Sequence, residues 1–393
     1  MKITNDILYV GVNDHDIDLF EGHYIVPEGM AYNSYVVKGD KIAVMDSVDG
    51  HFTDEWIDKV KEVAAAPDYL VIQHMEPDHS GSIMGFMEAF PEAKIVSSQK
   101  AFTMMANFFE GEDFADRRVV VKEGDTLDLG GHVLNFVTAP MVHWPEVIMT
   151  YESTDKVLFS ADAFGRFGGL DKIGETSEED DDWACEARRY YFGIVGKYGP
   201  QVQAVLKKAA GLDIEIICAL HGPVLVSDLG YYLGLYDTWS KYESESEGVV
   251  IAYTSVYGHT KKAVEMLAEL LEAKGVPTVE VTDLARSDMA EAVEDAFRYD
   301  TVVFATTTFN NSIFPFMREF IESLTERSYQ NRRLAFIENG SWAPQAAKIM
   351  KGMFEGSKNM TYCDNNVKIL SALNDQSRAQ VEALAEEIAA AYK

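Results

Sequence analysis

The strongest constraint on the fold is a change in the pattern of apolar residues near residue 245. Residues 241–248, KYESESEG, are polar and acidic and end in glycine, and an apolar strand-like run follows directly. Short strand-like runs dominate before this segment, whereas strands and helices alternate strictly after it. The 393 residues also exceed one ordinary core, since a domain has roughly 100–200 residues. We therefore expect two domains, residues 1–246 and 247–393.

The first predicted domain contains short strands with helical patterns between some of them. The strand-like runs are residues 24–27, 34–37, 41–46, 69–73, 94–97, 132–137, 156–160 and 214–220. Apolar residues recur at the spacing of amphipathic helices in residues 53–65, 82–90, 101–109, 183–198 and 202–210. Strands that first come in pairs and are then separated by helices indicate two sheets with helices outside, an αββα sandwich.

The second predicted domain follows a strand–helix rhythm. Strands are expected at residues 249–253, 278–282, 301–305 and 333–338, and helices at 259–274, 289–297, 314–325, 344–354 and about 375–391. Apolar strands separated by amphipathic helices predict a doubly wound parallel sheet, an α/β fold. Ligands of such sheets bind beyond the carboxyl ends of the strands.

Composition excludes several classes of function. The net charge of −30 argues against nucleic acid as a partner, because phosphate backbones are bound by clustered Lys and Arg. The three cysteines form no C-x-x-C pair, so a metal site must use nitrogen and oxygen ligands. No stretch approaches the ~18 apolar residues of a membrane span, and the first residues lack the pattern of a signal peptide. We expect a cytoplasmic protein that does not enter the membrane.

A cluster of costly-to-bury side chains follows the strand at 69–73. His74, Glu76 and Asp78 alternate in a segment that we expect to be extended, with Pro77 favouring that backbone, so the three side chains point to one side. His79 adds a second imidazole. Three more candidates follow later strand-like runs: His143, Asp162 and His221.

The chemistry of this set is that of a metal site without thiolate. Carboxylates can bridge two cations and imidazole suits iron, so a dinuclear iron site fits better than a single zinc ion, with dizinc and dimanganese as alternatives. The four side chains that directly follow the apolar strand, from His74 to His79, are costly to bury and have few structural roles there. A single histidine after a strand, in contrast, is more often packed or hydrogen-bonded than a ligand. That applies to the remaining histidines, His15, His23, His51, His132 and His259.

Three polar loops follow strands of the second domain. Hydroxyls and a glycine before a helix form a site for a phosphate monoester, because backbone N–H groups and the helix dipole favour an anion. The loops also carry Phe309 and Trp342, which suit a flat aromatic ligand. Any one loop of this kind could simply turn the chain, but three in order on the correct strands are unlike chance. Their residues are Thr254, Ser255, Tyr257, Gly258, His259 and Thr260, then Thr306, Thr307, Thr308, Phe309, Asn310 and Asn311, then Asn339, Gly340, Ser341 and Trp342.

The motifs HMEPDHSG at 74–81, HWPE at 143–146, SADAFG at 160–165 and ALHGP at 219–223 resemble the metallo-β-lactamase-like domain of the flavodiiron proteins. Hydrolases of that superfamily have H-x-H-x-D-H as the first motif, and Glu76 replaces its second histidine here, as in the flavodiiron branch. The resemblance implies that His74, Glu76 and His143 bind one iron, that Asp78 and His221 bind the other, and that Asp162 bridges them. It implies for His79 either a place on the second iron or replacement by water. Residues implied around the irons are Trp144 and Pro145 and, on weaker grounds, His23 and Tyr191.

The second domain resembles a flavodoxin, which implies FMN with Trp342 beside its ring system. His259 departs from that pattern, where Asn more often precedes the closing Thr. Together the two resemblances span residues 4–390 and imply an oxidoreductase for electron transport, in which electrons pass from FMN to two irons that reduce dioxygen to water or nitric oxide to nitrous oxide. A metal-dependent hydrolase fused to a regulatory flavodoxin, and an electron carrier with a vestigial metal site, are the alternatives.

The same family implies a separate electron donor, usually rubredoxin, with a reduced deazaflavin as the alternative. It also implies a head-to-tail homodimer in which each FMN faces the irons of the partner, with a tetramer as the alternative. An acidic rubredoxin would need a local basic patch on this acidic chain. The candidates are Lys261, Lys262, Arg332 and Arg333.

Overall fold

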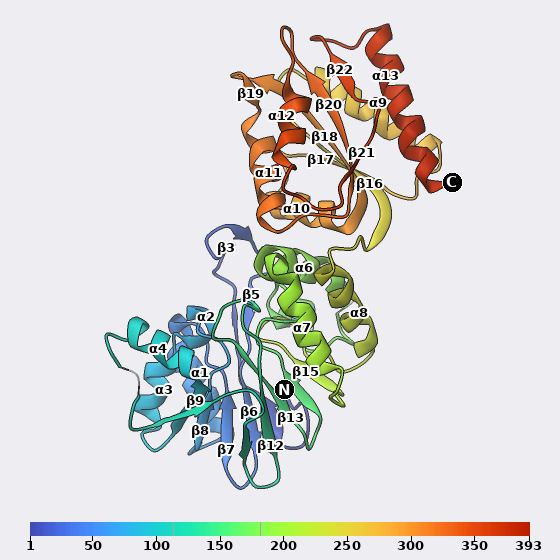
Figure 1. Ribbon diagram of the computed structural model, residues 1–393. Helices are drawn as coiled ribbons and strands as arrows, with labels where there is room; N and C mark the ends of the chain where they lie inside the picture. Colours follow the sequence, from blue (N-terminus) through green and yellow to red (C-terminus); the bar gives the residue numbers. More distant parts are fainter. Residues whose placement is uncertain (113, 181) are drawn as a thin grey trace. The chain divides into compact units, whose positions relative to one another are not determined.

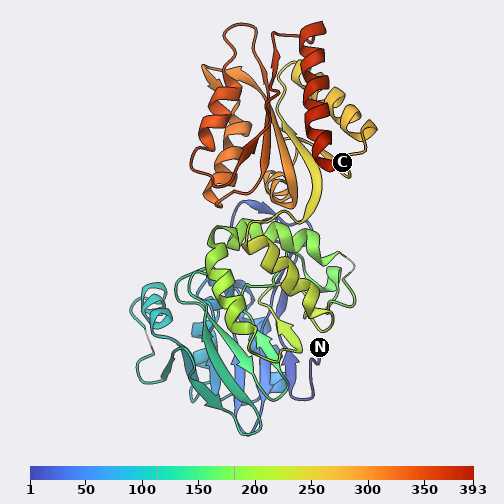
Figure 2. The ribbon, with the colours of Figure 1, turned by 45° about the vertical axis from the view of Figure 1, so that its right-hand side comes forward.

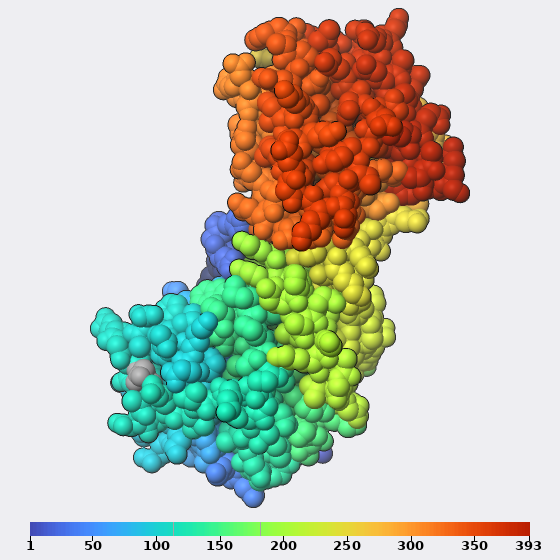
Figure 3. Space-filling view, in the orientation of Figure 1, coloured from blue at the N-terminus to red at the C-terminus, as the bar shows by residue number. Residues whose placement is uncertain are grey.

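The computed structural model describes residues 1–112, 114–180 and 182–393. Its chain folds as two compact units, Met1–Tyr236 and Asp237–Lys393 (Figure 1). The space-filling view colours the first unit from blue to green and the second from yellow to red (Figure 3). The first strand of the second unit begins at Ser246. The domain boundary at residue 246 stays a prediction. Among the described helices, none is long and apolar enough to cross a membrane.

The first unit contains two facing β-sheets. The first sheet has the order β1-β6-β7-β8-β9-β10, in which β6 is antiparallel to both neighbours and β7 to β10 are parallel. The second sheet has the order β11-β12-β13-β14-β15, in which only the β14–β15 pair is parallel. The strand bounds are β1 (Ile7–Tyr9), β6 (Tyr35–Lys38), β7 (Ile42–Met45), β8 (Tyr69–Val71), β9 (Lys94–Ser98), β10 (Arg118–Val121), β11 (Thr126–Asp128), β12 (Val133–Thr138), β13 (Ile148–Glu152), β14 (Val157–Phe159) and β15 (Ile216–Cys218).

One apolar core lies between these sheets. Val37, Met45 and Val71 of the first sheet share it with Phe136 and Phe159 of the second. Helices α1, α3 and α4 lie outside the first sheet, and α6, α7 and α8 lie on the other side of the unit (Figure 1). This confirms the predicted αββα sandwich. The helices are α1 (Thr53–Val63), α2 (Pro77–Ser80), α3 (Ile83–Ala89), α4 (Gln99–Phe108), α5 (Leu170–Ile173), α6 (Trp183–Tyr190), α7 (Gly199–Ala209) and α8 (Leu229–Ser240).

Several short strands were absent from the sequence prediction. They include β13 at the centre of the second sheet and the small pair β2 (Val12–Asp14) with β5 (Met30–Tyr32). Strand β3 (Leu19–Phe20) is a further one, and it pairs with β4 (Tyr24–Ile25), which lies within the predicted run 24–27. The predicted helix at 183–198 is also not one regular helix. It continues after α6 as a π-turn, Tyr191–Val195, and a 3-10 turn, Gly196–Tyr198.

The second unit is the predicted doubly wound parallel sheet. Its order is β17-β16-β18-β20, and two short strands, β21 and β22, both pair with β20. These two strands, which the sequence did not predict, complete a flavodoxin-like order. The strand bounds are β16 (Ser246–Tyr253), β17 (Val279–Asp283), β18 (Tyr299–Phe309), β19 (Ser312–Ile313), β20 (Arg333–Asn339), β21 (Thr361–Tyr362) and β22 (Val367–Ile369).

Helices cover both faces of this sheet. Figure 2 shows α9 and α13 on one face and α11 and α12 on the other. Helix α13 begins where Asn374 and Ser377 cap each other's backbone N–H groups, and its face from Val381 to Ile388 is buried against the sheet. The helices are α9 (His259–Ala273), α10 (Met289–Arg298), α11 (Pro315–Glu326), α12 (Ala346–Met353) and α13 (Asp375–Ala389).

Candidate metal centre and cofactor cavity

The segment after β8 does not stay extended, contrary to the sequence prediction. Glu76 has extended backbone angles, and Pro77 then begins the short helix α2. Proline is favoured at the first helical position, because its fixed φ suits the helix and its missing N–H leaves no donor unpaired. The turn separates the side chains into two groups. His74 and Glu76 belong to one potential metal site, and Asp78 and His79 belong to another.

The first group contains His74, Glu76, His143 and Asp162. The Nε2 atom of His74 lies 3.2 Å from Glu76 Oε2 and 3.2 Å from Asp162 Oδ2. The Nε2 atom of His143 lies 3.1 Å from each of the same two oxygens. Four donor atoms from three separate loops thus converge on one point.

The second group contains Asp78, His79 and His221, all buried. The Nε2 atoms of His79 and His221 are only 3.0 Å apart, and they lie 3.2 Å and 3.3 Å from Asp78 Oδ2. His79, whose role the sequence left open, therefore points into this group.

Asp162 stands between the two groups. Its Oδ2 faces the first group, whereas its Oδ1 lies 3.3 Å from His79 Nε2 and 3.6 Å from His221 Nε2. Neither carboxylate oxygen of Asp162 or of Asp78 has a hydrogen-bond partner among the described residues, although both side chains are buried. Such atoms are costly to bury unless a cation binds them.

Charge coupling in the centre is strong. Burial opposes the charged form of every group here, but the histidines outweigh it for the carboxylates and lower the pKa of Glu76 to about 2 and that of Asp78 further. The carboxylates in turn outweigh burial for the imidazoles, and they raise the pKa of His143 to about 9 and that of His79 to about 10. In the absence of metal, protons therefore balance the carboxylates.

Outer contacts orient the imidazoles. The Nδ1 atom of His74 lies 2.8 Å from Glu146 Oε1, which also accepts a hydrogen bond from the Met75 N–H at 2.9 Å. The His221 Nδ1 atom lies 2.8 Å from the carbonyl oxygen of Ala31. These contacts leave Nε2 of both rings facing the centre, a common arrangement around metal-binding histidines. The sequence analysis did not identify Glu146, although it lies within the motif HWPE.

Of the four residues that the resemblance placed around the irons, only some lie at the metal centre. The Trp144 ring lies edge-on to His74, with 5.2 Å between centroids, so it borders the centre, and Pro145 is exposed. His23 is exposed and packs on Tyr24, not on a metal-binding candidate. Tyr191 packs against Phe192 and Tyr236.

Tyr190, the residue before Tyr191, packs against the centre, as does Tyr32, whose ring centroid lies 6.1 Å from that of His221. The ring centroid of Tyr190 lies 5.4 Å from that of His221. Burial, followed by the charges of Asp162, Glu76 and Asp78, raises the pKa of Tyr190 well above the ordinary value.

The second unit has a cavity of about 470 Å³ at the carboxyl end of its sheet. All three predicted loops contribute to it. Loop residues that line it are Ser255, Tyr257, His259, Thr260, Thr307, Thr308, Phe309, Asn339, Gly340, Ser341 and Trp342. Two further lining residues were not predicted: Val256, and Ser371, which follows β22.

The first loop has the geometry of an anion cradle. The Ser255 hydroxyl accepts hydrogen bonds from the N–H groups of Gly258 and Lys261, at 3.1 and 3.2 Å, and Gly258 has a φ of +85° at the start of α9. This positive φ places the loop against the helix N-terminus, where backbone N–H groups favour a phosphate. The exposed rings of Tyr257 and Trp342 stand at the rim.

Several predicted loop residues form hydrogen bonds that hold the loops around the cavity in place. The hydroxyls of Thr254 and Thr306 are 2.6 Å apart and buried. Thr308 also accepts hydrogen bonds from the N–H groups of Gln345 and Ala346 at the start of α12. Residues of the predicted set outside the lining of the cavity are Thr254, Gly258, Thr306, Asn310 and Asn311.

Arg332 was wrongly predicted as part of a basic docking patch. It is 2% exposed, and its guanidinium donates hydrogen bonds to the carbonyl oxygens of Tyr242, Glu243 and Phe297. Lys261 and Lys262 are exposed at the start of α9.

Comparisons with known proteins agree with both sites. The family model of the ODP family beta lactamase matches residues 30–222, and that of the flavodoxin domain matches residues 250–369. The anaerobic nitric oxide reductase flavorubredoxin of Salmonella arizonae is 29% identical over 348 residues, which are 87% of this chain and 72% of that protein.

Two solved structures have the same fold over their whole length. The rubredoxin oxygen:oxidoreductase of Desulfovibrio gigas has a TM-score of 0.91 at 27% identity, and the match covers 100% of this chain and 98% of that one. The flavodiiron protein of Giardia intestinalis has a TM-score of 0.92 at 24% identity, with 100% and 97% covered. Since both domain models match in this order and full-length relatives share the fold, the chain belongs to the flavodiiron family.

Proposed function

We propose that the protein is a flavodiiron oxidoreductase that transfers electrons from FMN to two non-haem irons, where dioxygen or nitric oxide is reduced. The observation that carries this proposal is the position of Asp162. Its two oxygens face two separate groups of nitrogen and oxygen donors, as a bridging carboxylate requires. A single metal ion would need no such second group. The absence of thiolate and the mixture of imidazole and carboxylate suit iron.

In this proposal each iron has its own ligand set, joined by Asp162. His74, Glu76 and His143 bind the first iron, and Asp78, His79 and His221 bind the second. His79 is included because its Nε2 lies 3.0 Å from that of His221. Two imidazole nitrogens at this distance, both beside Asp78, are best explained as ligands of one cation. Glu146 holds the His74 ring, and Trp144 and Tyr190 form part of the wall.

The cavity of the second unit is proposed to hold FMN. The Ser255 loop and the start of α9 would bind its phosphate, and Trp342 with Tyr257 and Phe309 would cover its ring system. Together, the bound FMN and irons supply one- and two-electron steps to a small acceptor. The chain itself contributes the orientation of the ligands and a buried site that limits access of water.

The choice of substrate and donor rests on named relatives. One is called a nitric oxide reductase and another a rubredoxin oxygen:oxidoreductase, so dioxygen and nitric oxide are the proposed acceptors and rubredoxin is the proposed donor. We further propose a head-to-tail homodimer, with a tetramer as the alternative, and a cytoplasmic location.

The experiment is turnover of the iron- and FMN-loaded chain with reduced rubredoxin, followed in parallel with an oxygen electrode and a nitric oxide electrode. We expect consumption of at least one gas that requires both cofactors. Consumption of neither gas by a chain that retains FMN and two irons would contradict the proposal. Hydrolysis of a β-lactam or thioester by that chain would instead favour the hydrolase alternative.

A further inference from the structure

A third group of potential metal ligands lies in the first unit, apart from the metal centre. It contains His132, Glu152 and Asp155, and one donor atom of each lies within 4.8 Å of the others. Glu146, beside the metal centre, precedes β13, and Glu152 ends that strand. Six residues of extended chain span about 20 Å, so the third group is at the opposite end of the strand.

His132 is the unusual member of this group. It is 4% exposed, and its Nδ1 has no hydrogen-bond partner among the described residues. Glu152 Oε1 lies 3.2 Å from this nitrogen, but without the direction of a hydrogen bond. On the other side of the ring, Asp6 Oδ2 lies 3.6 Å from Nε2. The sequence predicted an ordinary packed histidine, yet a buried ring nitrogen without a partner costs free energy.

The same features mark the metal centre. There too, imidazole nitrogens and carboxylate oxygens converge at 3.0 to 3.3 Å, and buried donor atoms lack hydrogen-bond partners among the residues described. A separation of 3.2 Å is close to the roughly 3.3 Å between ligands that bind one tetrahedral ion at about 2.0–2.1 Å.

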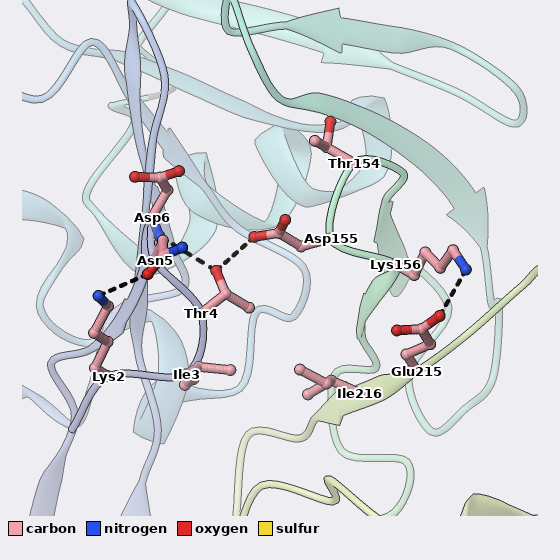
Figure 4. Close-up of a pocket in the computed structure, with 10 residues that line it drawn as sticks. All are labelled: Lys2, Ile3, Thr4, Asn5, Asp6, Thr154, Asp155, Lys156, Glu215 and Ile216. Carbon is pink, nitrogen blue, oxygen red and sulfur yellow. Dashed lines mark hydrogen bonds and ion pairs between the residues drawn. The ribbon is translucent and has the colours of Figure 1, made fainter.

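The two carboxylates are held in place. Glu152 is fully buried, and its oxygens accept hydrogen bonds from the N–H groups of Thr154 and Asp155, both at 2.7 Å. Asp155 accepts a hydrogen bond from the Thr4 hydroxyl at 2.5 Å, which leaves its Oδ1 for a further ligand (Figure 4). Each carboxylate therefore keeps lone pairs that a cation can use.

The third group borders solvent at Asp155, its partly buried member. Asp6, Thr154 and Asp155 line a polar pocket of about 740 Å³, drawn in Figure 4, through which water can complete a coordination sphere. Lys156, another lining residue, does not oppose a cation there with an unbalanced charge. Its Nζ lies 2.7 Å from Asp213 and 2.6 Å from Glu215.

We propose that His132 Nδ1, Glu152 and Asp155 bind one divalent transition-metal ion of the Zn²⁺ type, with Asp6 positioning the opposite side of the imidazole. One imidazole and two carboxylates with water suit such an ion, and the two carboxylates balance its charge. The ion would link the loop before β12 to the turn after β13, where the Thr154 hydroxyl already donates to the carbonyl oxygen of Gly131. Its role is to stabilise this end of the first unit.

The test is equilibrium dialysis of the full chain, loaded with FMN and iron, against Zn²⁺, with zinc and iron measured in the same sample. We expect one zinc ion per chain without loss of iron. The substitutions His132→Gln and Asp155→Asn should each weaken zinc binding at least about 10-fold, as loss of even outer contacts does. Asp58→Asn removes an exposed carboxylate of α1 and should leave zinc binding unchanged.

A second readout is the thermal unfolding midpoint, which zinc should raise in the parent chain but not in the His132→Gln chain. Unchanged FMN and iron contents show that the variants fold. If His132→Gln does not fold, Asp155→Asn decides, because Asp155 is only partly buried. No zinc on the parent chain beyond that which replaces iron, or equal zinc binding by parent and Asp155→Asn chains, would overturn the proposal.

Discussion

The metal centre and the cofactor cavity are built from different parts of the chain. In the metal centre, charged side chains are brought together in the interior, and His74, His79 and Asp162 have no exposed surface. In the cavity, loop backbone and hydroxyls form the base, and the aromatic rings at its rim are open to solvent. Tyr257 is 90% exposed and Trp342 is 82% exposed.

This difference determines how strongly the substitution of one side chain affects each site. Buried charges depend on one another, so the loss of one leaves several others without balance. The cavity shares its contacts among many backbone and hydroxyl groups. We therefore expect single substitutions to cost much more in the metal centre than at the rim of the cavity, and the following predictions test that contrast.

The largest effect is expected for Asp162→Asn. An amide keeps the shape but removes the charge and one of the two oxygens that face the donor groups. We expect iron to fall from two ions per chain to one or none, and turnover to fall by more than about 100-fold, since even outer contacts cost about 10–100-fold. Iron analysis and gas-electrode assays measure both. Asp213→Asn, at an exposed ion pair, should retain both irons, and an Asp162→Asn chain with two tightly bound irons would break the contrast.

A smaller effect is expected for Glu146, which touches His74 but not the proposed iron. Glu146→Ala removes the acceptor that orients the ring and should weaken iron binding about 10–100-fold. Glu146→Gln keeps an acceptor oxygen and should weaken iron binding less than Glu146→Ala does. Competition with a chelator measures the affinity, and Glu123→Ala, which breaks a surface ion pair with Lys208, is the matched control. Equal iron affinity for Glu146→Ala and the parent would remove the positioning role.

The charge balance of the metal centre predicts a pH dependence in the iron-free chain. The pKa values of His143 and His79, about 9 and about 10, lie above the unfolded value of about 6.5. Such groups stabilise the fold fully below pH about 6.5, and the contribution is lost as the pH rises through the folded values.

The thermal midpoint of the iron-free chain should therefore fall between about pH 7 and about pH 10. That of the iron-loaded chain should fall less, because metal-bound imidazoles are already neutral. Calorimetry of both forms over this range measures the difference. Parallel curves would show that the imidazoles carry no extra protons in the iron-free fold.

The smallest effect is expected at the rim of the cavity. Trp342→Leu should weaken FMN binding by about 2- to 12-fold, the equivalent of one aromatic contact of about 0.5–1.5 kcal/mol. Fluorescence titration of the FMN-free chain measures the affinity. Tyr231→Ala, at a 48% exposed ring of the first unit, should have no effect. A loss of more than about 100-fold for Trp342→Leu would mean that the cavity, like the metal centre, depends on single side chains.

The sequence predicted the residue types of both sites but not all of their geometry. The fold class follows from the periodicity of apolar residues, which is clear in long strands and helices. The same periodicity shows where the strands end and therefore which polar residues follow them. Strand β22 has only three residues, two of them buried, so it is too short for a periodic signal, and Ser371 after it was missed. The burial of Arg332 is not visible in the sequence, because three of the carbonyl oxygens that accept its hydrogen bonds, those of Tyr242, Glu243 and Phe297, are distant in sequence.

Two of the differences from the sequence prediction lie at local helical turns. Pro77 was read as extended because the residue before a proline avoids the helical region, but Pro77 itself begins α2. The π-turn after α6 contains five residues, Tyr191–Val195. Tyr191, which only the family resemblance implied, begins this π-turn, whereas Tyr190, the last residue of α6, packs against His221.

The most direct test of the proposed centre is anomalous X-ray diffraction at the iron edge from crystals of the iron-loaded chain. Two peaks are predicted, one among His74, Glu76 and His143 and one among Asp78, His79 and His221, with Asp162 touching both. A single peak, or iron bound elsewhere in the chain, would contradict the diiron assignment.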